Sequence, residues 1–179
     1  MAIKAGDKIP SVTLKQWSSN GLQDLATDSV FGGKKVVMFA VLGAFTPDCS
    51  AKHLPGFVEN LDKFKALGIE LACLAVNDPF VMQAWSEAGK ADAITMLADG
   101  NGTFTKALGL ELDGSGYGLG TRCQRFALYA ENGVVKSIAV EEPGAFEVSG
   151  AEAMLKAVGG EKAGEWEIPG GQAAFLTCS

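Results

Sequence analysis

The sequence predicts an α/β fold with a mixed sheet flanked by helices. Up to about residue 108, short apolar runs alternate with segments of helical periodicity, an order typical of parallel strands joined by helices. An Asn-Gly pair at 132–133 then separates two further apolar runs, which indicates an antiparallel hairpin. A last helical segment follows the hairpin. We therefore expect one domain over residues 1–160 and a C-terminal tail over 161–179.

The composition is that of an ordinary globular chain, and it narrows the classes of partner. The 179 residues are 47% apolar, and 21 acidic against 15 basic residues give a net charge of −6. This charge argues against nucleic acid or an anionic membrane as the main partner. No apolar run approaches the ~18 residues of a spanning helix, and the N-terminus lacks the apolar core of a signal peptide. We expect a cytoplasmic protein, with the mature form of an organellar protein as the alternative.

The four cysteines, Cys49, Cys73, Cys123 and Cys178, form no Cys-x-x-Cys pair, and the chain has one histidine. These residues give no zinc-ligand pattern, so we expect neither a metal nor a cofactor. In a reducing compartment, cysteines are more often catalytic than structural.

The first part of the chain predicts a hairpin followed by a buried strand. Residues 9–14 are expected to form an edge strand, with Pro10 near its start where a missing donor is tolerated, and residues 22–25 are its expected partner. The apolar run at 36–42 has the pattern of a fully buried strand.

A helix is predicted from residue 47 to about residue 67, because apolar residues recur there at helical spacing. Thr46 is a suitable N-cap, and Pro47 suits the first helical position, where no backbone N–H is needed. Pro55 removes one backbone hydrogen bond inside this helix, so we expect a kink near it.

The remaining elements follow from similar signals. Asp78 and Pro79 open a helix as cap and first residue, and Ser149 with Glu152 has the pattern of a capping box. The glycine-rich run at 113–121 lacks the Lys-Ser/Thr of a phosphate loop and is more typical of a mobile loop beside a site. The other expected elements are strands at 69–76 and 94–98, a helix at 101–108 and a hairpin of 125–130 with 134–140.

Cys49 stands in the first turn of the helix predicted from residue 47. Free backbone N–H groups and the positive end of the helix dipole favour an anion there, and the thiolate is the nucleophilic form of cysteine. Cys49 is therefore a candidate nucleophile. The alternative is a small buried hydrophobic residue, because free cysteine is among the most buried residue types.

The segment around Cys49, GAFTPxCSxxHLPG at residues 43–56, resembles the peroxiredoxins. Within them it is closest in pattern to the type II, or peroxiredoxin-five-like, members of plant type. Segments at 75–82 and 97–100 share this resemblance, which extends over about residues 3–158. It implies a thioredoxin-like fold with an extra N-terminal β-hairpin. It also implies an antioxidant thiol peroxidase that reduces hydrogen peroxide and alkyl hydroperoxides through a cysteine sulfenic acid, in a homodimer whose chains each keep their own site.

The resemblance also implies roles for three residues. Cys49 would attack the peroxide, and the Thr46 hydroxyl would lie near the sulfur. Arg125 matches the arginine that pairs with the reactive sulfur, and its planar fork could hold the sulfur and a peroxide oxygen together. Arg122 would be secondary or serve a dimer contact. The alternative is that both arginines are ordinary surface residues.

Two residues depart from the family pattern: Leu42 replaces a proline, and Asp48 replaces a threonine. A carboxylate beside the cysteine disfavours the thiolate by like-charge repulsion. Because adjacent helical residues point ~100° apart, we expect Asp48 to face solvent and to be screened. We expect reduced activity, and the alternative function is a redox-sensing or interaction protein with weak turnover.

The catalytic cycle also needs a reductant, because the sulfenic acid of Cys49 must condense with a second thiol. Cys73 matches the second cysteine of plant-type relatives and is our first candidate for the resolving residue, with Cys123 and Cys178 as further candidates. A one-cysteine mechanism with glutathione or glutaredoxin is equally compatible, and thioredoxin is the other candidate reductant. His53, four residues after Cys49, could suggest a protease dyad, but the motif around it favours peroxide chemistry and a packed or exposed histidine near the site.

Overall fold

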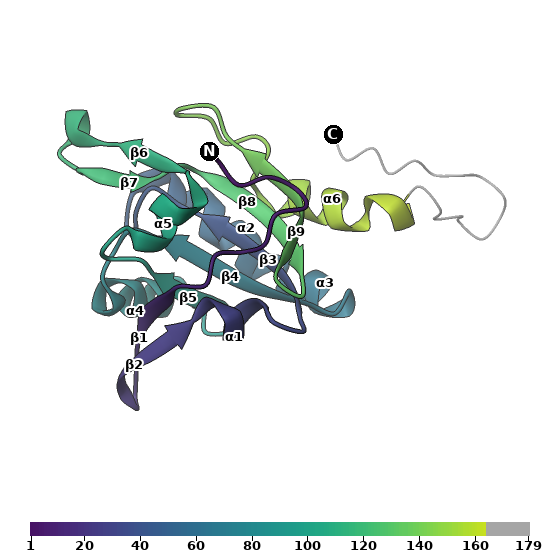
Figure 1. Ribbon diagram of the computed structural model, residues 1–179, viewed down its shortest axis with the longest axis horizontal. Coiled ribbons are helices and arrows are strands. Elements are labelled where there is room, and N and C mark those ends of the chain that lie inside the picture. Colours follow the sequence, from purple (N-terminus) through teal and green to yellow (C-terminus); the bar gives the residue numbers. More distant parts are fainter. Residues whose placement is uncertain (164–179) are drawn as a thin grey trace, which may run out of the picture.

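The computed structural model describes residues 1–163, and the tail predicted at 161–179 lies almost entirely outside them. Its centre is a seven-stranded sheet in the order β2-β1-β5-β4-β3-β8-β9 (Figure 1). The β3–β4 and β4–β5 pairs are parallel, and the other pairs are antiparallel, which confirms the predicted mixed sheet. The strands are β1 (Thr13–Ser18), β2 (Gly21–Ala26), β3 (Lys35–Ala40), β4 (Ile69–Ala75), β5 (Thr95–Ala98), β8 (Phe126–Glu131) and β9 (Val134–Val140).

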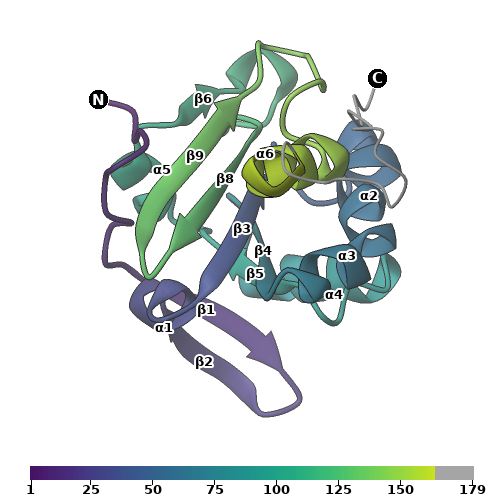
Figure 2. The same cartoon turned by 90° about the vertical axis from the view of Figure 1, so that its right-hand side faces the viewer.

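Helices cover both faces of this sheet (Figure 2). On one face lie α2, α3, α4 and α6, and on the other lie α1, α5 and the N-terminal segment. A separate two-stranded hairpin, β6 with β7, extends from the body (Figure 1). The bounds are α1 (Thr27–Phe31), α2 (Leu54–Glu59), α3 (Leu61–Ala66), α4 (Pro79–Ala88), α5 (Thr103–Leu108), α6 (Ala151–Ala163), β6 (Glu111–Asp113) and β7 (Thr121–Cys123).

The sheet separates two hydrophobic cores because successive side chains of a strand point to opposite faces. The α4-side core contains Phe39, Phe57 and Trp85 together with the cysteines Cys49 and Cys73. The α5-side core, on the opposite face, contains Met38, Leu74, Phe104, Phe126 and Cys123. The fold therefore places Cys49 and Cys73 in one layer and Cys123 in the other.

The N-terminal hairpin is present, but its first strand lies later than predicted. The strand is Thr13–Ser18 instead of 9–14, and it is internal, since Lys15 pairs with Ala98 of β5 while β2 forms the edge. The backbone before it is engaged by the start of α1. The Thr27 hydroxyl donates to the Pro10 carbonyl at 2.7 Å and accepts from the Val12 N–H at 3.0 Å.

The helix predicted as one kinked element over 47–67 is in fact three segments. Helical backbone begins at Pro47, passes through a π-helix at Cys49–His53, and continues as α2 and α3. The π-helix lies directly before Pro55, whose ring would clash with the carbonyl four residues earlier in a regular helix. A second break, which we did not predict, is at Asn60, whose side chain donates to the Gly56 carbonyl at 2.7 Å.

Residues 114–120 of the glycine-rich run form a loop, as predicted, but this loop closes a short β6–β7 hairpin that we did not predict, with the Gly114 N–H donating to Gly120 at 2.7 Å. The predicted capping box is absent, because the Ser149 hydroxyl donates to the Glu141 carboxylate at 2.7 Å, and α6 begins at Ala151. By contrast, the predicted turn at 132–133 is confirmed, with positive φ at both Asn132 and Gly133.

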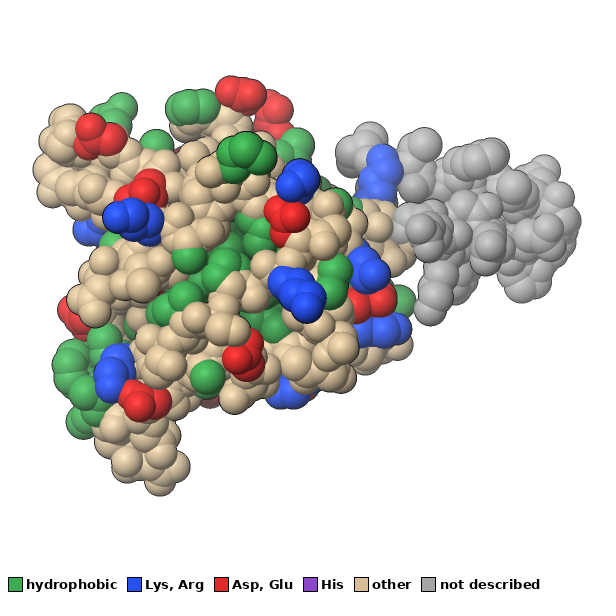
Figure 3. Space-filling model, viewed as in Figure 1, with side chains coloured by type: hydrophobic (Ala, Val, Ile, Leu, Met, Phe, Trp, Pro, Cys, Tyr) green, Lys and Arg blue, Asp and Glu red, His purple; other side chains and the backbone are tan. Residues whose placement is uncertain are grey.

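The surface carries charges of both signs. On the face in Figure 3, basic and acidic side chains are interspersed around a central group of hydrophobic ones. None of the helices in the described part of the chain combines the length and the hydrophobicity needed to cross a bilayer.

Candidate functional site

The loop that leads from β3 to Cys49 is held by backbone hydrogen bonds. The Val41 N–H donates to Leu74 at 3.0 Å, and the Ala44 N–H donates to the Asn77 side chain at 2.8 Å. Phe45 then takes a left-handed conformation, with φ of 64°, that side chains other than glycine adopt rarely. After this tight turn the helical backbone begins at Pro47, so Cys49 lies in the first helical turn.

Arg125 meets Cys49 directly. Arg125 Nη2 donates to Cys49 Sγ at 3.2 Å, although the two residues are 76 positions apart in sequence. Cys49 has no exposed surface, and Arg125 is 8% exposed. The structure therefore brings together a buried sulfur and a buried guanidinium, and it rules out the interpretation of Arg125 as an ordinary surface residue.

His53 lies on the other side of the same guanidinium. Its Nδ1 is 2.9 Å from Arg125 Nη1, and its Nε2 is 2.8 Å from the Ser149 carbonyl oxygen. Because arginine only donates and a carbonyl only accepts, His53 must carry its proton on Nε2 and offer its Nδ1 lone pair to Arg125. The neutral imidazole is thus part of a continuous chain from the Ser149 carbonyl to the Cys49 sulfur.

The surroundings of His53 favour that neutral form. The ring is fully buried between Phe39, Phe57 and Phe146, with ring centroids 4.9–5.6 Å from its own. The pKa of His53 is lowered to about 4, mainly by burial and also by the Arg125 charge, while the Ser149 carbonyl and the Glu141 charge act in the opposite direction.

Thr46 does not cap the helix with its side chain. Its hydroxyl donates to the Gly43 carbonyl at 2.7 Å, and its own carbonyl accepts the first helical hydrogen bond, from the Ser50 N–H at 3.0 Å. The hydroxyl proton is therefore engaged within the loop, and the oxygen lone pairs are what Thr46 can offer to another group.

Arg122 is half-buried and contacts the same loop from outside. It donates to the Leu119 carbonyl at 2.9 Å and to the Val76 carbonyl at 3.2 Å. A Cβ on Gly43 would lie 2.8 Å from its Nη1, so glycine is needed for this close approach. Arg122 therefore supports the loop and does not contact the Cys49 sulfur.

The described cysteines are all free and buried, and two of them carry strongly shifted thiols. Burial raises the pKa of Cys73 well above its usual value, and the charges of Cys49 and Cys123 would raise it further. Burial likewise raises the pKa of Cys123 to about 12. Neither thiol is ionised at neutral pH while it stays buried. Cys178, the remaining candidate, lies outside the described residues.

The structure bears on several predictions about the site. Asp48 is exposed, as predicted. His53 was expected to be packed or exposed near the site; it is packed and also bonded to Arg125, and no protease-like dyad forms because Arg125 donates to its Nδ1. Sequence reasoning missed Ser149, Phe146 and Glu141. The four-residue spacing from Cys49 was the available signal for His53; the other residues join the site only through the folded loop.

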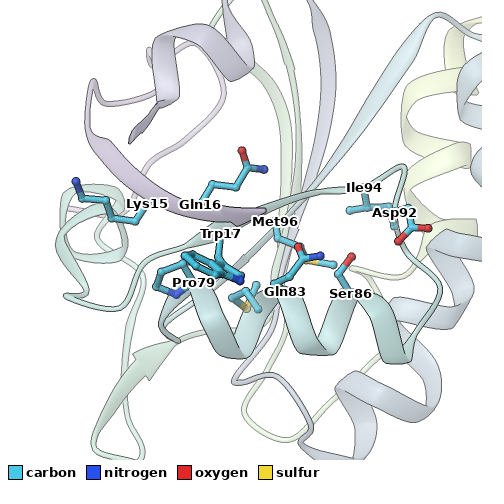
Figure 4. A pocket seen from close by; sticks show the side chains of 11 residues that line it. Lys15, Gln16, Trp17, Pro79, Gln83, Ser86, Asp92, Ile94 and Met96 are labelled. Atoms are coloured by element: carbon cyan, nitrogen blue, oxygen red, sulfur yellow. The ribbon is translucent and has the colours of Figure 1, made fainter. Parts of the chain in front are cut away.

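The hollow in Figure 4 is separate from this chemistry. It has a volume of about 180 Å³ and lies between β1, β5 and α4, with Trp17, Gln83 and Asp92 among its lining residues. No partner of Cys49 lines it. In the part of the chain that the structure describes, no cluster of His, Cys, Asp or Glu could hold a metal ion.

The pKa of His53 predicts a pH dependence of stability. In the unfolded chain this residue binds a proton below its ordinary value of 6.5, whereas in the folded protein it does so only near 4. The unfolded state therefore binds more protons between these values, and the free energy of unfolding should fall as pH falls through this window. We expect a loss of about 2 kcal/mol between pH 7 and about pH 5.

Urea unfolding of the wild type and of His53→Asn at both pH values measures this effect. Asparagine cannot ionise but keeps an oxygen near the Nδ1 position, so the variant should lose most of the pH dependence. An equal pH dependence in the two proteins would contradict a buried neutral histidine.

Known proteins are similar to this chain in both sequence and fold. Residues 4–155 match the redoxin family. The chain is 47% identical over 161 residues to peroxiredoxin-2E, chloroplastic, of Arabidopsis thaliana, covering 87% of this chain and 69% of that protein. It is 46% identical over 157 residues to peroxiredoxin-2C of Oryza sativa subsp. japonica, covering 86% of this chain and 97% of that one.

A solved structure is similar over the same region. The crystal structure of reduced Prx3 in complex with hydrogen peroxide from Vibrio vulnificus has a TM-score of 0.84 and 50% identity, covering 87% of this chain and 99% of that chain. These matches confirm the predicted family and its thioredoxin-like fold. The chain belongs to the redoxin family and, within it, to the type II, peroxiredoxin-five-like peroxiredoxins of plant type, which are thiol-dependent peroxidases.

Proposed function

We propose that this chain reduces hydrogen peroxide and alkyl hydroperoxides with Cys49 as the nucleophile. The observation that carries the proposal is the 3.2 Å contact between Arg125 Nη2 and Cys49 Sγ. A guanidinium buried against a sulfur favours the thiolate, and the thiolate is the form that attacks. The family membership supports the same reaction class.

The reaction balances with these groups alone. The Cys49 thiolate attacks one peroxide oxygen, so an S–O bond forms while the O–O bond breaks. Cysteine is oxidised to sulfenic acid, and the other oxygen leaves as an alkoxide or hydroxide that takes a proton from solvent to give an alcohol or water. The charge moves from sulfur to the leaving oxygen during this step, and donors aimed along that path lower the barrier.

Arg125 and Thr46 are our candidates for that task. Besides the hydrogen aimed at Cys49, Nη2 carries a second one that could donate to a peroxide oxygen. Thr46, whose proton is already donated to Gly43, could accept the hydrogen of the peroxide. Together they would hold the substrate in line with the sulfur.

Access is the constraint on this proposal, because Cys49 has no exposed surface. Peroxide reaches the sulfur only when covering side chains move. Leu42 and Ala44, which are partly buried against the core that contains Cys49, are candidates for that cover. Leu42 is also one of the two departures from the family pattern, so slow turnover with sensor-like behaviour is the second candidate function.

Substitutions at Cys49 and Arg125 test the main proposal. Cys49→Ser should abolish peroxide consumption, and Arg125→Lys should lower the rate at least about 100-fold, since a point charge cannot serve sulfur, His53 and peroxide at once. Arg122→Lys is the matched control, and its effect should be much smaller. The measurement is donor-dependent peroxide consumption. A Cys49→Ser protein with wild-type rates would refute the peroxidatic role, and negligible wild-type turnover with reversible oxidation of Cys49 would favour the sensor.

For the second half-reaction we propose that Cys73 resolves the sulfenic acid. Both cysteines belong to the α4-side core, whereas Cys123 belongs to the other core. Cys73 is buried with a raised pKa, so the π-helix around Cys49 must rearrange before a disulfide can form. The final reductant is thioredoxin, glutaredoxin or glutathione.

Mass spectrometry after one equivalent of peroxide tests this assignment. We expect an intramolecular disulfide between Cys49 and Cys73, and loss of thioredoxin-dependent turnover in Cys73→Ser. Cys123→Ser is the control and should leave the disulfide intact. A persistent sulfenic acid, together with full activity of Cys73→Ser with glutathione, would instead establish the one-cysteine mechanism, and a link to Cys178 would overturn the choice of Cys73.

We further propose a homodimer in which each chain keeps its own site. Every hydrogen bond from Ser149 to Cys49 lies within one chain. Phe45 and Phe80, which are 55% and 52% exposed, belong to the two segments that the hydrogen bond from Ala44 to Asn77 joins, so adjoining segments each expose a large apolar side chain. Such a patch suits a contact with a second copy.

Sedimentation analysis of Phe80→Glu tests the dimer. The charge should shift the protein to monomers at micromolar concentration, while Leu22→Glu, at an equally exposed leucine on β2, should not. A wild-type protein that sediments as a monomer would contradict the proposal.

The cytoplasmic location stays a prediction, as does the division into a domain at 1–160 and a tail at 161–179. One of the similar proteins carries a chloroplastic name.

A further inference from the structure

We propose that Glu141 is a positioning residue for the peroxidatic centre: it holds the backbone at 147–149 so that the Ser149 carbonyl orients His53, and His53 orients Arg125. The inference rests on the proposed roles of Cys49 and Arg125. It gives a function to a buried carboxylate that the reaction itself does not use.

The carboxylate of Glu141 is buried among backbone donors. Its residue is 7% exposed, and its Oε2 accepts from the N–H groups of Glu147, Val148 and Ser149 at 2.8–2.9 Å and from the Ser149 hydroxyl at 2.7 Å. Its Oε1 accepts from the Glu147 N–H at 2.9 Å. Burial alone would raise the pKa of Glu141, but these hydrogen bonds outweigh it and lower the pKa. The ionised carboxylate of Glu141 therefore holds the loop at residues 147–149 in place by hydrogen bonds.

These hydrogen bonds determine where the Ser149 carbonyl points. Glu141 takes the N–H and the hydroxyl of Ser149, and the carbonyl of the same residue is left for His53 Nε2 at 2.8 Å. That contact fixes the proton of His53 on Nε2. The Nδ1 lone pair is then available for Arg125 Nη1, and because the guanidinium is planar and rigid, Nη2 is directed to the sulfur.

The same loop also supports the guanidinium by packing. Phe146 directly precedes the segment that Glu141 holds, and its ring is 5.5 Å from Arg125 Cζ and 4.9 Å from the His53 ring. In addition, the Glu141 N–H donates to the Arg125 carbonyl at 2.9 Å, directly beyond the paired ends of β8 and β9. Glu141 thus holds the backbone of Arg125 by its own backbone and the side chain of Arg125 by way of the loop.

A purely structural role would predict a less stable protein with an unchanged centre. A positioning role predicts a change in the state of His53, which can be observed directly because His53 is the only histidine in the chain. ¹⁵N-histidine NMR reports which ring nitrogen carries the proton. We expect a single Nε2–H tautomer in the wild type and a mixture of tautomers in the folded Glu141→Ala protein.

The kinetic test uses a double-mutant cycle. Glu141→Ala should lower the rate of peroxide reduction by about 10- to 100-fold, in line with the cost of misplacing a catalytic group. In a His53→Ala background the same change should have a clearly smaller effect, because the route through His53 is already broken and only the packing of Phe146 and the backbone contact to Arg125 remain. Glu141→Gln, which keeps an oxygen acceptor, should lose less activity and retain the tautomer. The exposed neighbour Glu142→Ala is the matched control and should behave as wild type.

The outcomes separate this inference from the proposed function. If Glu141→Ala folds with wild-type kinetics and a single Nε2–H tautomer, or if its effect simply adds to that of His53→Ala, the positioning role is refuted. If Glu141→Ala does not fold, Glu141→Gln decides by the same two readouts. If the Cys49→Ser variant still consumes peroxide, only the proposed function is refuted, because the tautomer measurement does not depend on turnover.

Discussion

The site depends on a single contact across the fold, the hydrogen bond from Arg125 to the Cys49 sulfur. A buried cation is costly unless its donors are satisfied, and this guanidinium has one acceptor in the sulfur and another in His53. The sulfur reaches its place through the turn after β3, and the guanidinium through the start of β8, which pairs with β3 along its whole length. Adjacent strands therefore deliver both halves of the centre to the same end of the sheet.

Burial has opposite consequences for the cysteines of this chain. At Cys49 it removes water from a contact with a cation, which strengthens the electrostatic attraction. At Cys73 and Cys123 no cation of the described residues is within hydrogen-bonding distance, and burial leaves a neutral thiol. Equal burial thus yields one candidate nucleophile and two thiols that are neutral in this conformation, so Cys73 can resolve the sulfenic acid only after the local rearrangement proposed above.

The parts of the fold that could be predicted are those with a local signature. The strands β3 and β4 are continuous apolar runs, α4 begins with a capping aspartate and a proline, and the β8–β9 turn contains Asn-Gly. Predictions failed where a distant group competed for a residue. Thr27 takes the backbone at 10–12 from the first strand, and Glu141 takes the Ser149 hydroxyl from its expected role as a cap.

The same reasoning explains why the candidate site was predicted only in part. Cys49 could be found from the strand, turn and helix around it, whereas Arg125 carries no local signal and was reached through the family resemblance. The link from Ser149 to His53 spans 96 residues and uses a backbone carbonyl, which every residue possesses. No residue type in the sequence predicts a contact of this kind. A chemical centre that is positioned by backbone groups can therefore be read from coordinates but not from composition or spacing, and loops that carry no catalytic side chain can still determine the geometry at the sulfur.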